Sequence, residues 1–336
     1  MHIFVLSTGG TIGSCEAHGV ISPEHGREMT LLRMYRDRYA DAVQFTVRPV
    51  CDILSENADD IFYETLFAAL RDIPAEADGV IVLHGTDTLS YTAALCAMAC
   101  VGACRIPVGF VSSAYVLSDA RQNGLCNFHA AVRYIKQGGA GFFVPYRNTD
   151  GSVQIHLATR VTEADAFLAD FQSAKNQVLA RIDADGTVQF SDASDLPKQE
   201  QLSGVDRAEN YAEIHFQKSV LPVKLYPNLD FSAIQPNKET CAAVLLIGYH
   251  SGTAPVRALT AFAKRMQAQS IPVYLAPIPR AAALYASTRA LLCLGIQPMF
   301  SVTAESALAK LKLAFNQTTC APEAFLQQSL YFEEVI

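Results

Sequence analysis

The sequence predicts an α/β protein with two doubly wound domains: a larger N-terminal domain with a mostly parallel sheet, and a smaller C-terminal, Rossmann-like domain. The first observation is length, because 336 residues correspond to about two domains. The second is composition, since 50% hydrophobic and 18% charged residues are typical of a compact globular protein. The third is that strand-like apolar runs alternate with helical periodicities, the pattern of βαβ units.

The N-terminal half supplies most of this alternation. Apolar runs that predict buried strands cover Ile3–Leu6, Gly79–Leu83, Pro107–Val111 and Gly141–Val144. A helix is expected after Asn57, a residue type that caps helices well, because the apolar residues that follow recur on one helical face. Two more helices are expected, one from near Leu89 and one over Asp119–Gln137.

A polar stretch poor in aliphatic residues divides the chain. It predicts a linker over residues 186–215, between an N-terminal domain of residues 1–185 and a C-terminal domain of residues 216–336. The second domain repeats the strand and helix pattern. Its expected elements are strands at Ala242–Ile247 and Ile271–Leu275 and helices at Val256–Gln269, around Ala281–Cys293, and at Thr303–Phe315.

Charge and cysteine usage exclude several classes of function. The net charge of −7 argues against nucleic acid or an anionic membrane as a partner. The apolar run Met1–Leu6 is too short for an export signal, and no run approaches the ~20 residues of a membrane span, which favours a cytoplasmic protein. Cys96, Cys100 and Cys104 share one helical face without a second ligand pair nearby, so buried thiols are favoured over a zinc site.

Four polar segments are expected at strand ends, where ligands bind in open α/β sheets. They are STGGTIGS (residues 7–14), ILSEN (53–57), HGTDTLSYTA (84–93) and GYHSGTAP (248–255). Taken singly they have simpler interpretations: Asp87 or Thr88 can cap a helix, and His84 can be structural. The first segment also lacks the spacing and the lysine of a phosphate-binding loop.

Taken together, STGGTIGS and HGTDTLSYTAAL resemble the bacterial-type L-asparaginase family. Further stretches that fit are SENADD, LSDARQNG, LYPNLD, GYHSGTAP and TAESALAKL, so the similarity extends over almost the whole chain. LSDARQN makes the sequence look more like the cytoplasmic branch. The resemblance implies hydrolysis of the side-chain amide of asparagine or a related small amide, with release of ammonia and without metal or cofactor. It also implies a homodimer or homotetramer.

The same resemblance implies roles for individual residues. Thr11 is the expected nucleophile of an acyl-enzyme mechanism, and Thr86 with Asp87 forms a second catalytic cluster. Ser55 and Glu56 are expected to bind the α-amino and α-carboxylate groups of the substrate, together with Gly85 and with Asp87, which balances the ammonium group. The glycines around Thr11 would let the substrate approach closely.

The sequence departs from the family pattern at two positions. Val20 stands where a tyrosine is expected and Glu163 where a lysine is expected, so the proton relay must differ. Glu163 is therefore a candidate catalytic residue, with Arg160 as a compensating charge; candidate bases are Glu163, His18 and His250. The alternative is a non-catalytic or partner-dependent amino-acid-binding protein on the same fold.

Overall fold

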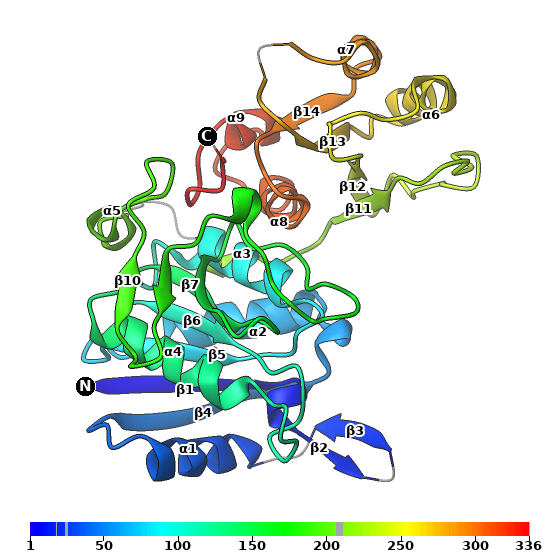
Figure 1. Ribbon diagram of the computed structural model, residues 1–336. Helices are drawn as coiled ribbons and strands as arrows, with labels where there is room; N and C mark the ends of the chain where they lie inside the picture. Colours follow the sequence, from blue (N-terminus) through cyan, green and yellow to red (C-terminus); the bar gives the residue numbers. More distant parts are fainter. Residues whose placement is uncertain (18, 24–25, 206–210, 282, 336) are drawn as a thin grey trace. The chain divides into compact units, whose positions relative to one another are not determined.

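The computed structural model describes residues 1–17, 19–23, 26–205, 211–281 and 283–335. The chain forms two compact units, Met1–Glu213 and Ile214–Ile336 (Figure 1). Both are α/β, which confirms the predicted fold class. The first unit contains the larger sheet and the second a smaller parallel sheet.

The described part of the first unit is organised around an eight-stranded sheet with the order β10-β9-β8-β7-β6-β5-β1-β4. From β4 to β7 the strands run parallel, and β8, β9 and β10 continue the sheet with antiparallel pairing. The strand bounds are β1 His2–Gly9, β4 Gln44–Ile53, β5 Gly79–Leu83, β6 Val108–Val111, β7 Phe142–Arg147, β8 Val153–Leu157, β9 Ala180–Ile182 and β10 Val188–Phe190. A separate hairpin pairs β2 (Ser14–Ala17) with β3 (Val20–Pro23).

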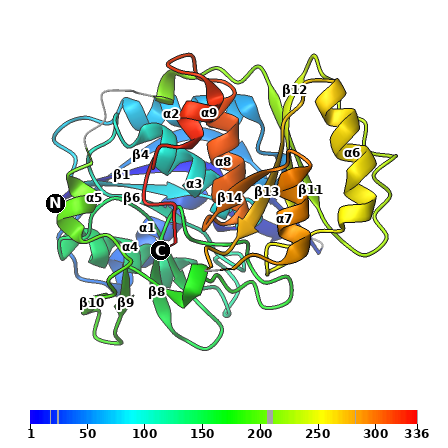
Figure 2. The same ribbon diagram turned by 90° about the horizontal axis from the view of Figure 1, so that it is seen from above.

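Helices cover both faces of this sheet (Figures 1 and 2). On one face α1 (Arg27–Arg38) packs against α4 (Gly124–Lys136), with the rings of Tyr35 and Phe128 5.4 Å apart. On the other face α2 (Asp60–Arg71) packs against α3 (Leu89–Cys100). Eleven of the twelve α3 residues are buried, Cys96 and Cys100 among them, which explains why the helix sequence is mostly apolar or small.

The strand order places a switch point at β1. The chain passes from β1 to its neighbour β4, and then through α2 to β5 on the other side of β1. In open α/β sheets ligands bind outside the carboxyl ends of the strands at such a point. The loops that follow β1, β4 and β5 therefore lie where the fold predicts a binding crevice.

Within the stretch expected to form most of a linker, the described residues 186–205 and 211–213 contain regular structure, and the first unit extends to Glu213. Val188–Phe190 is β10, and Gln199–Ser203 is the short helix α5. Apolar side chains within this stretch are buried, among them Leu196 and Leu202. These few aliphatic residues anchor a segment whose average composition is that of a loop.

The second unit is a four-stranded parallel sheet, within the described residues, in the order β11-β12-β13-β14. Alternate residues of its strands enter two cores: Val244 and Leu246 face α6 and α7, while Ala243 and Leu245 face α8 (Figure 2). The bounds are β11 Ser219–Lys224, β12 Cys241–Ile247, β13 Val273–Ile278, β14 Gln297–Phe300, α6 Val256–Ala268, α7 Ala286–Cys293, α8 Ala304–Ala314 and α9 Pro322–Leu326.

The helix starts differ from expectation where a turn precedes the helix. Asp59 caps α2, its side chain accepting from the Phe62 amide at 2.8 Å, while Asn57 ends a short 3-10 turn, Ser55–Asn57. Helix α4 begins at Gly124 because residues 119–123 are held in a turn, with Asp119 accepting from the Arg121 amide. Polar turn residues and cap residues are the same residue types, so the sequence did not separate them.

Candidate functional site

Three loops carry the polar residues predicted for the site, and each follows one of three adjacent parallel strands. Thr11 begins a 3-10 turn (Thr11–Gly13) after β1, Ser55 begins the turn after β4, and Thr86 and Asp87 connect β5 to α3. Because β4, β1 and β5 are neighbours and run parallel, their carboxyl ends lie at one edge of the sheet. The structure therefore brings these loops together.

The main chains of the loops are in direct contact at glycine positions. Gly10 adopts φ 74°, and a Cβ there would overlap the backbone of Gly85 and lie 2.6 Å from the carbonyl carbon of His84. A Cβ on Gly85 would in turn lie 2.7 Å from the Cβ of Ser55. Glycine is therefore required at both positions, for space and, at Gly10, for its positive φ. The residue after each glycine is one of the two predicted catalytic threonines.

Hydrogen bonds join the same loops. The Gly10 amide donates to the Ile53 carbonyl at 3.0 Å, and the Thr88 hydroxyl donates to the Ser55 carbonyl at 2.8 Å. The Thr8 hydroxyl donates to the Leu83 carbonyl at 2.7 Å, linking the ends of β1 and β5. These bonds satisfy backbone groups beyond the sheet ladder and hold the loops in fixed register.

The predicted site residues differ in their exposure. Ser55 is buried, Thr11 and Thr86 are half-buried, and Glu56 and Asp87 are exposed. The hydroxyl-bearing residues thus lie deeper in the structure than the carboxylates. This order suits a site in which a cationic group of a ligand meets carboxylates near solvent, while groups that accept hydrogen bonds meet hydroxyls below.

Glu163 lies next to the helix that starts after Asp87. It is exposed, and its Oε1 accepts a hydrogen bond from the Tyr91 hydroxyl at 2.6 Å. Tyr91 is the third residue of α3, and Asp87 lies in the turn two residues before that helix begins. Arg160, considered as a compensating charge, is buried and donates to the Asp195 carbonyl at 2.7 Å.

Tyr91 received no role from the sequence, although it lies within the motif HGTDTLSYTA. Its signal was positional, because it is the third residue of the helix that follows the Thr86–Asp87 turn. The partner could not be inferred, because Glu163 is 72 residues away in sequence.

The end of the stretch LSDARQNG packs against the Thr11 loop. A Cβ on Gly124 would lie 3.2 Å from the Cδ1 atom of Ile12, the residue after Thr11. The Gly124 amide donates to the Ser113 hydroxyl, and Asn123 accepts from the Ala114 amide at 2.9 Å. Asn123 and Gly124 therefore contribute hydrogen bonds and close packing next to the Thr11 loop.

Neither histidine considered as a candidate base lies in the described part of the unit that holds the threonines. His250 is exposed and belongs to the second unit, and His18 lies outside the described residues. Val20, in the hairpin that follows Thr11, is 62% exposed. His84 is buried, and its Nδ1 lies 2.8 Å from the Gly85 carbonyl oxygen.

Burial lowers the pKa of His84 to about 4, so the imidazole is neutral at pH 7. The unfolded chain binds a proton below about pH 6.5, whereas the folded protein does not until near pH 4, so acidification favours unfolding over this window. We expect wild type to lose about 2 kcal/mol more stability than His84→Gln between pH 7 and pH 5.

Urea unfolding followed by circular dichroism at the two pH values measures this difference. His250→Gln, which changes an exposed imidazole, serves as the control and should retain the wild-type pH dependence. Equal pH dependence in His84→Gln and wild type would show that His84 is not held neutral by burial.

The glycine contacts give a second prediction with a matched control in the same loop. Gly10→Ala should destabilise the protein by about 2 kcal/mol or more, because the methyl group meets the Gly85 backbone at a strained φ. Gly13→Ala should have little effect, since nothing lies within 4 Å of its Cβ position. Thermal unfolding of both variants measures the contrast, and equal melting temperatures would refute the close contact.

Two general features of the described residues bear on the class of site. None of the helices there is both long enough and apolar enough to cross a bilayer. Nor does that part of the chain gather three or more His, Cys, Asp or Glu side chains in a cluster suited to a metal ion.

The sequence of this chain is similar to a known protein family and to several known proteins. Residues 2–195 match a family model described as asparaginase, N-terminal. A glutamyl-tRNA(Gln) amidotransferase subunit from Halobacterium salinarum is 28% identical over 253 residues, 72% of this chain and 58% of that protein. The chain thus spans less than two-thirds of the length of that relative. L-Asparaginase of Thermococcus kodakarensis is 24% identical over 76% of this chain and 74% of its own.

Solved structures show the same fold over the full chain. The thermostable L-asparaginase of Thermococcus kodakarensis superposes with a TM-score of 0.78 at 22% identity, covering 99% of both chains. L-Asparaginase I of Vibrio cholerae gives 0.79 at 21% identity, covering 100% of this chain and 99% of that one. Because the family model matches more than half of the sequence, this protein belongs to the asparaginase family.

Proposed function

We propose that this protein is an amidohydrolase that converts asparagine, or a related small amide, to the acid and ammonia through a threonine nucleophile. The observation that carries the proposal is the contact of Gly10 with Gly85, which fixes the adjacent Thr11 and Thr86 on two packed loops. Membership of the asparaginase family supports the reaction class.

In the proposed reaction the Thr11 hydroxyl oxygen attacks the carbonyl carbon of the substrate's side-chain amide. The hydroxyl proton passes to the leaving nitrogen, which departs as ammonia and leaves an ester on Thr11. Water then hydrolyses this ester, releasing the acid and restoring the hydroxyl group. A threonine hydroxyl is a weak nucleophile at neutral pH, so a neighbouring group must accept its proton.

The substrate's α-ammonium group would meet the exposed carboxylates. Asp87 and Glu56 are both exposed at the rim and carry negative charge suited to an α-ammonium group. Buried Ser55 would donate to the α-carboxylate. Glu163, next to Tyr91, would serve as the proton acceptor and donor in place of the family's lysine. We also expect a cytoplasmic homodimer or homotetramer.

A second candidate is a partner-dependent or non-catalytic amino-acid-binding protein. It is favoured by Val20 and Glu163, which replace the expected tyrosine and lysine, and by the similarity to an amidotransferase subunit, a protein whose name makes it one part of an assembly. Under this alternative the threonines bind a ligand and hydrolyse nothing without the partner.

The two candidates differ in whether the purified protein releases ammonia. We expect release from at least one member of a panel containing L-asparagine, L-glutamine and their D-isomers, measured by a coupled ammonia assay. Thr11→Val and Thr86→Val should each lower kcat about a thousandfold, since each removes a hydroxyl from the reacting cluster. Thr65→Val, an exposed hydroxyl on α2, is the control and should remain fully active.

Restoring the family residues tests the altered relay. If the relay is rebuilt around Glu163, the double variant Val20→Tyr, Glu163→Lys should lose at least tenfold in kcat, because it removes the group that carries the proton. Ammonia release from asparagine that appears only in the double variant would instead identify the wild type as an inactive relative. Steady-state kinetics on both proteins distinguishes these outcomes.

A further inference from the structure

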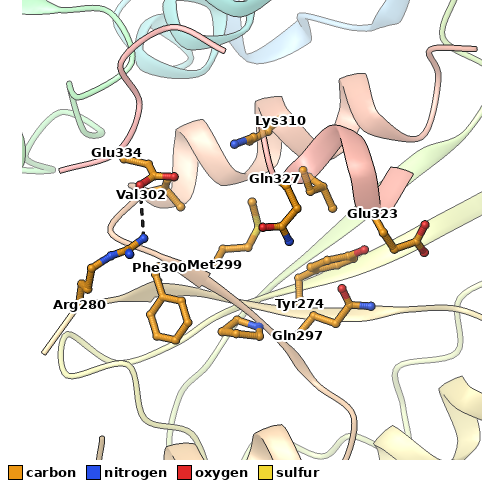
Figure 3. A pocket seen from close by; sticks show the side chains of 12 residues that line it. Tyr274, Arg280, Gln297, Met299, Phe300, Val302, Lys310, Glu323, Gln327 and Glu334 are labelled. Carbon is orange, nitrogen blue, oxygen red and sulfur yellow. Dashed lines mark hydrogen bonds and ion pairs between the residues drawn. The ribbon is translucent and has the colours of Figure 1, made fainter. Parts of the chain in front are cut away.

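The second unit contains a cavity of about 310 Å³ that has no part in the proposed reaction (Figure 3). It lies among β13, the edge strand β14, helices α8 and α9, and the C-terminal segment. Its volume falls at the lower end of the range for small-molecule sites. The residues given roles in the proposed reaction belong to the other unit, and His250 is not among the lining residues, so this cavity is a separate feature of the chain.

The wall of the cavity includes a buried hydroxyl group that lacks a partner. Tyr274 on β13 is 2% exposed, and its hydroxyl forms no hydrogen bond with any residue that the structure describes. Its ring packs edge-on against Phe315, with centroids 6.2 Å apart, and is therefore fixed in place. Buried polar groups in folded proteins are nearly always hydrogen-bonded, so this exception calls for a ligand or a bound water.

The protonation state of Tyr274 determines what it can bind. Burial and the negative charge of Glu323 raise its pKa to about 12. The phenol therefore keeps its proton at neutral pH and acts as a donor. An occupant of the cavity must offer this donor an acceptor, such as a carboxylate or carbonyl oxygen.

The charges around the cavity are unevenly compensated. Arg280 pairs with Glu334 at 3.3 Å, and buried Lys310 pairs with Glu333 at 2.8 Å. Glu323, at the end of the cavity near Tyr274 and Gln297, forms no ion pair within the described part of the chain (Figure 3). The uncompensated charge is thus negative and lies near the unpartnered hydroxyl. A cationic group on the occupant would balance it.

Part of the remaining wall is apolar. Met299 and Val302 are buried and line the cavity, and Leu326 of α9 completes this side. A short aliphatic group would fit against these side chains and lose contact with water. Among the described residues, the cavity thus offers the unpartnered Tyr274 donor, the Glu323 carboxylate without an ion pair and a small apolar surface.

We propose that this cavity binds a free α-amino acid with a short aliphatic side chain. Its carboxylate accepts from the Tyr274 hydroxyl, its ammonium group faces Glu323, and its side chain lies against Met299 and Val302. The proposal does not depend on the proposed hydrolysis, because the residues differ and the ligand carries no amide to hydrolyse.

Isothermal titration calorimetry of the full chain with L-valine and L-threonine tests this site. Binding is expected for both, while propylamine and propionate, which each lack one of the two charged groups, should bind at least about tenfold more weakly. Tyr274→Phe should weaken L-valine binding about tenfold, because one buried hydrogen bond is lost without a change of shape. Tyr285→Phe removes the hydroxyl of a residue that is 63% exposed and outside the cavity lining, and it should have no effect.

Glu323→Gln provides a second variant whose folding is not in question, since the side chain is exposed. It should weaken binding about threefold, a modest change because solvent screens the pair. Absence of binding at millimolar ligand, or equal affinity in Tyr274→Phe and wild type, would overturn the proposal. So would loss of binding in Asp87→Ala with none in Tyr274→Phe, which would place the amino acid in the other unit.

Discussion

The candidate site depends on one constraint, the contact between the main chains at Gly10 and Gly85. Two loops that follow adjacent parallel strands approach so closely that neither position has room for a side chain. The switch point at β1 makes this approach possible, because the chain leaves β1 for β4 and then crosses to β5. The positions of Thr11 and Thr86 follow directly, since each is the next residue in its loop.

Around this fixed centre the polar groups are arranged by depth. Ser55 is buried, the two threonines are half-buried, and Asp87, Glu56 and Glu163 are exposed. Charged groups stay hydrated at low cost near the surface, whereas a buried carboxylate would need a partner. The buried His84 illustrates the same rule, because it remains neutral in the structure.

The two residues expected from the sequence to depart from the family pattern are both exposed. Val20 is on a hairpin next to the Thr11 turn, and Glu163 contacts Tyr91 at the start of α3. The close-packed glycines and the adjacent hydroxyl groups lie deeper than Val20 and Glu163. A change of proton relay, or of partner, is therefore compatible with an unchanged backbone around Thr11.

The sequence by itself determined the fold class, the buried strands β1 and β5, and the residues expected at their ends, because hydrophobic periodicity and glycine-rich turns are local signals. It did not reveal β8 to β10, whose short or half-polar strands are stabilised by pairing with distant neighbours. Only the tertiary structure decided that Gly85 touches Gly10 and that Tyr91 meets Glu163. Such contacts join residues tens of positions apart, and no local pattern encodes the partner.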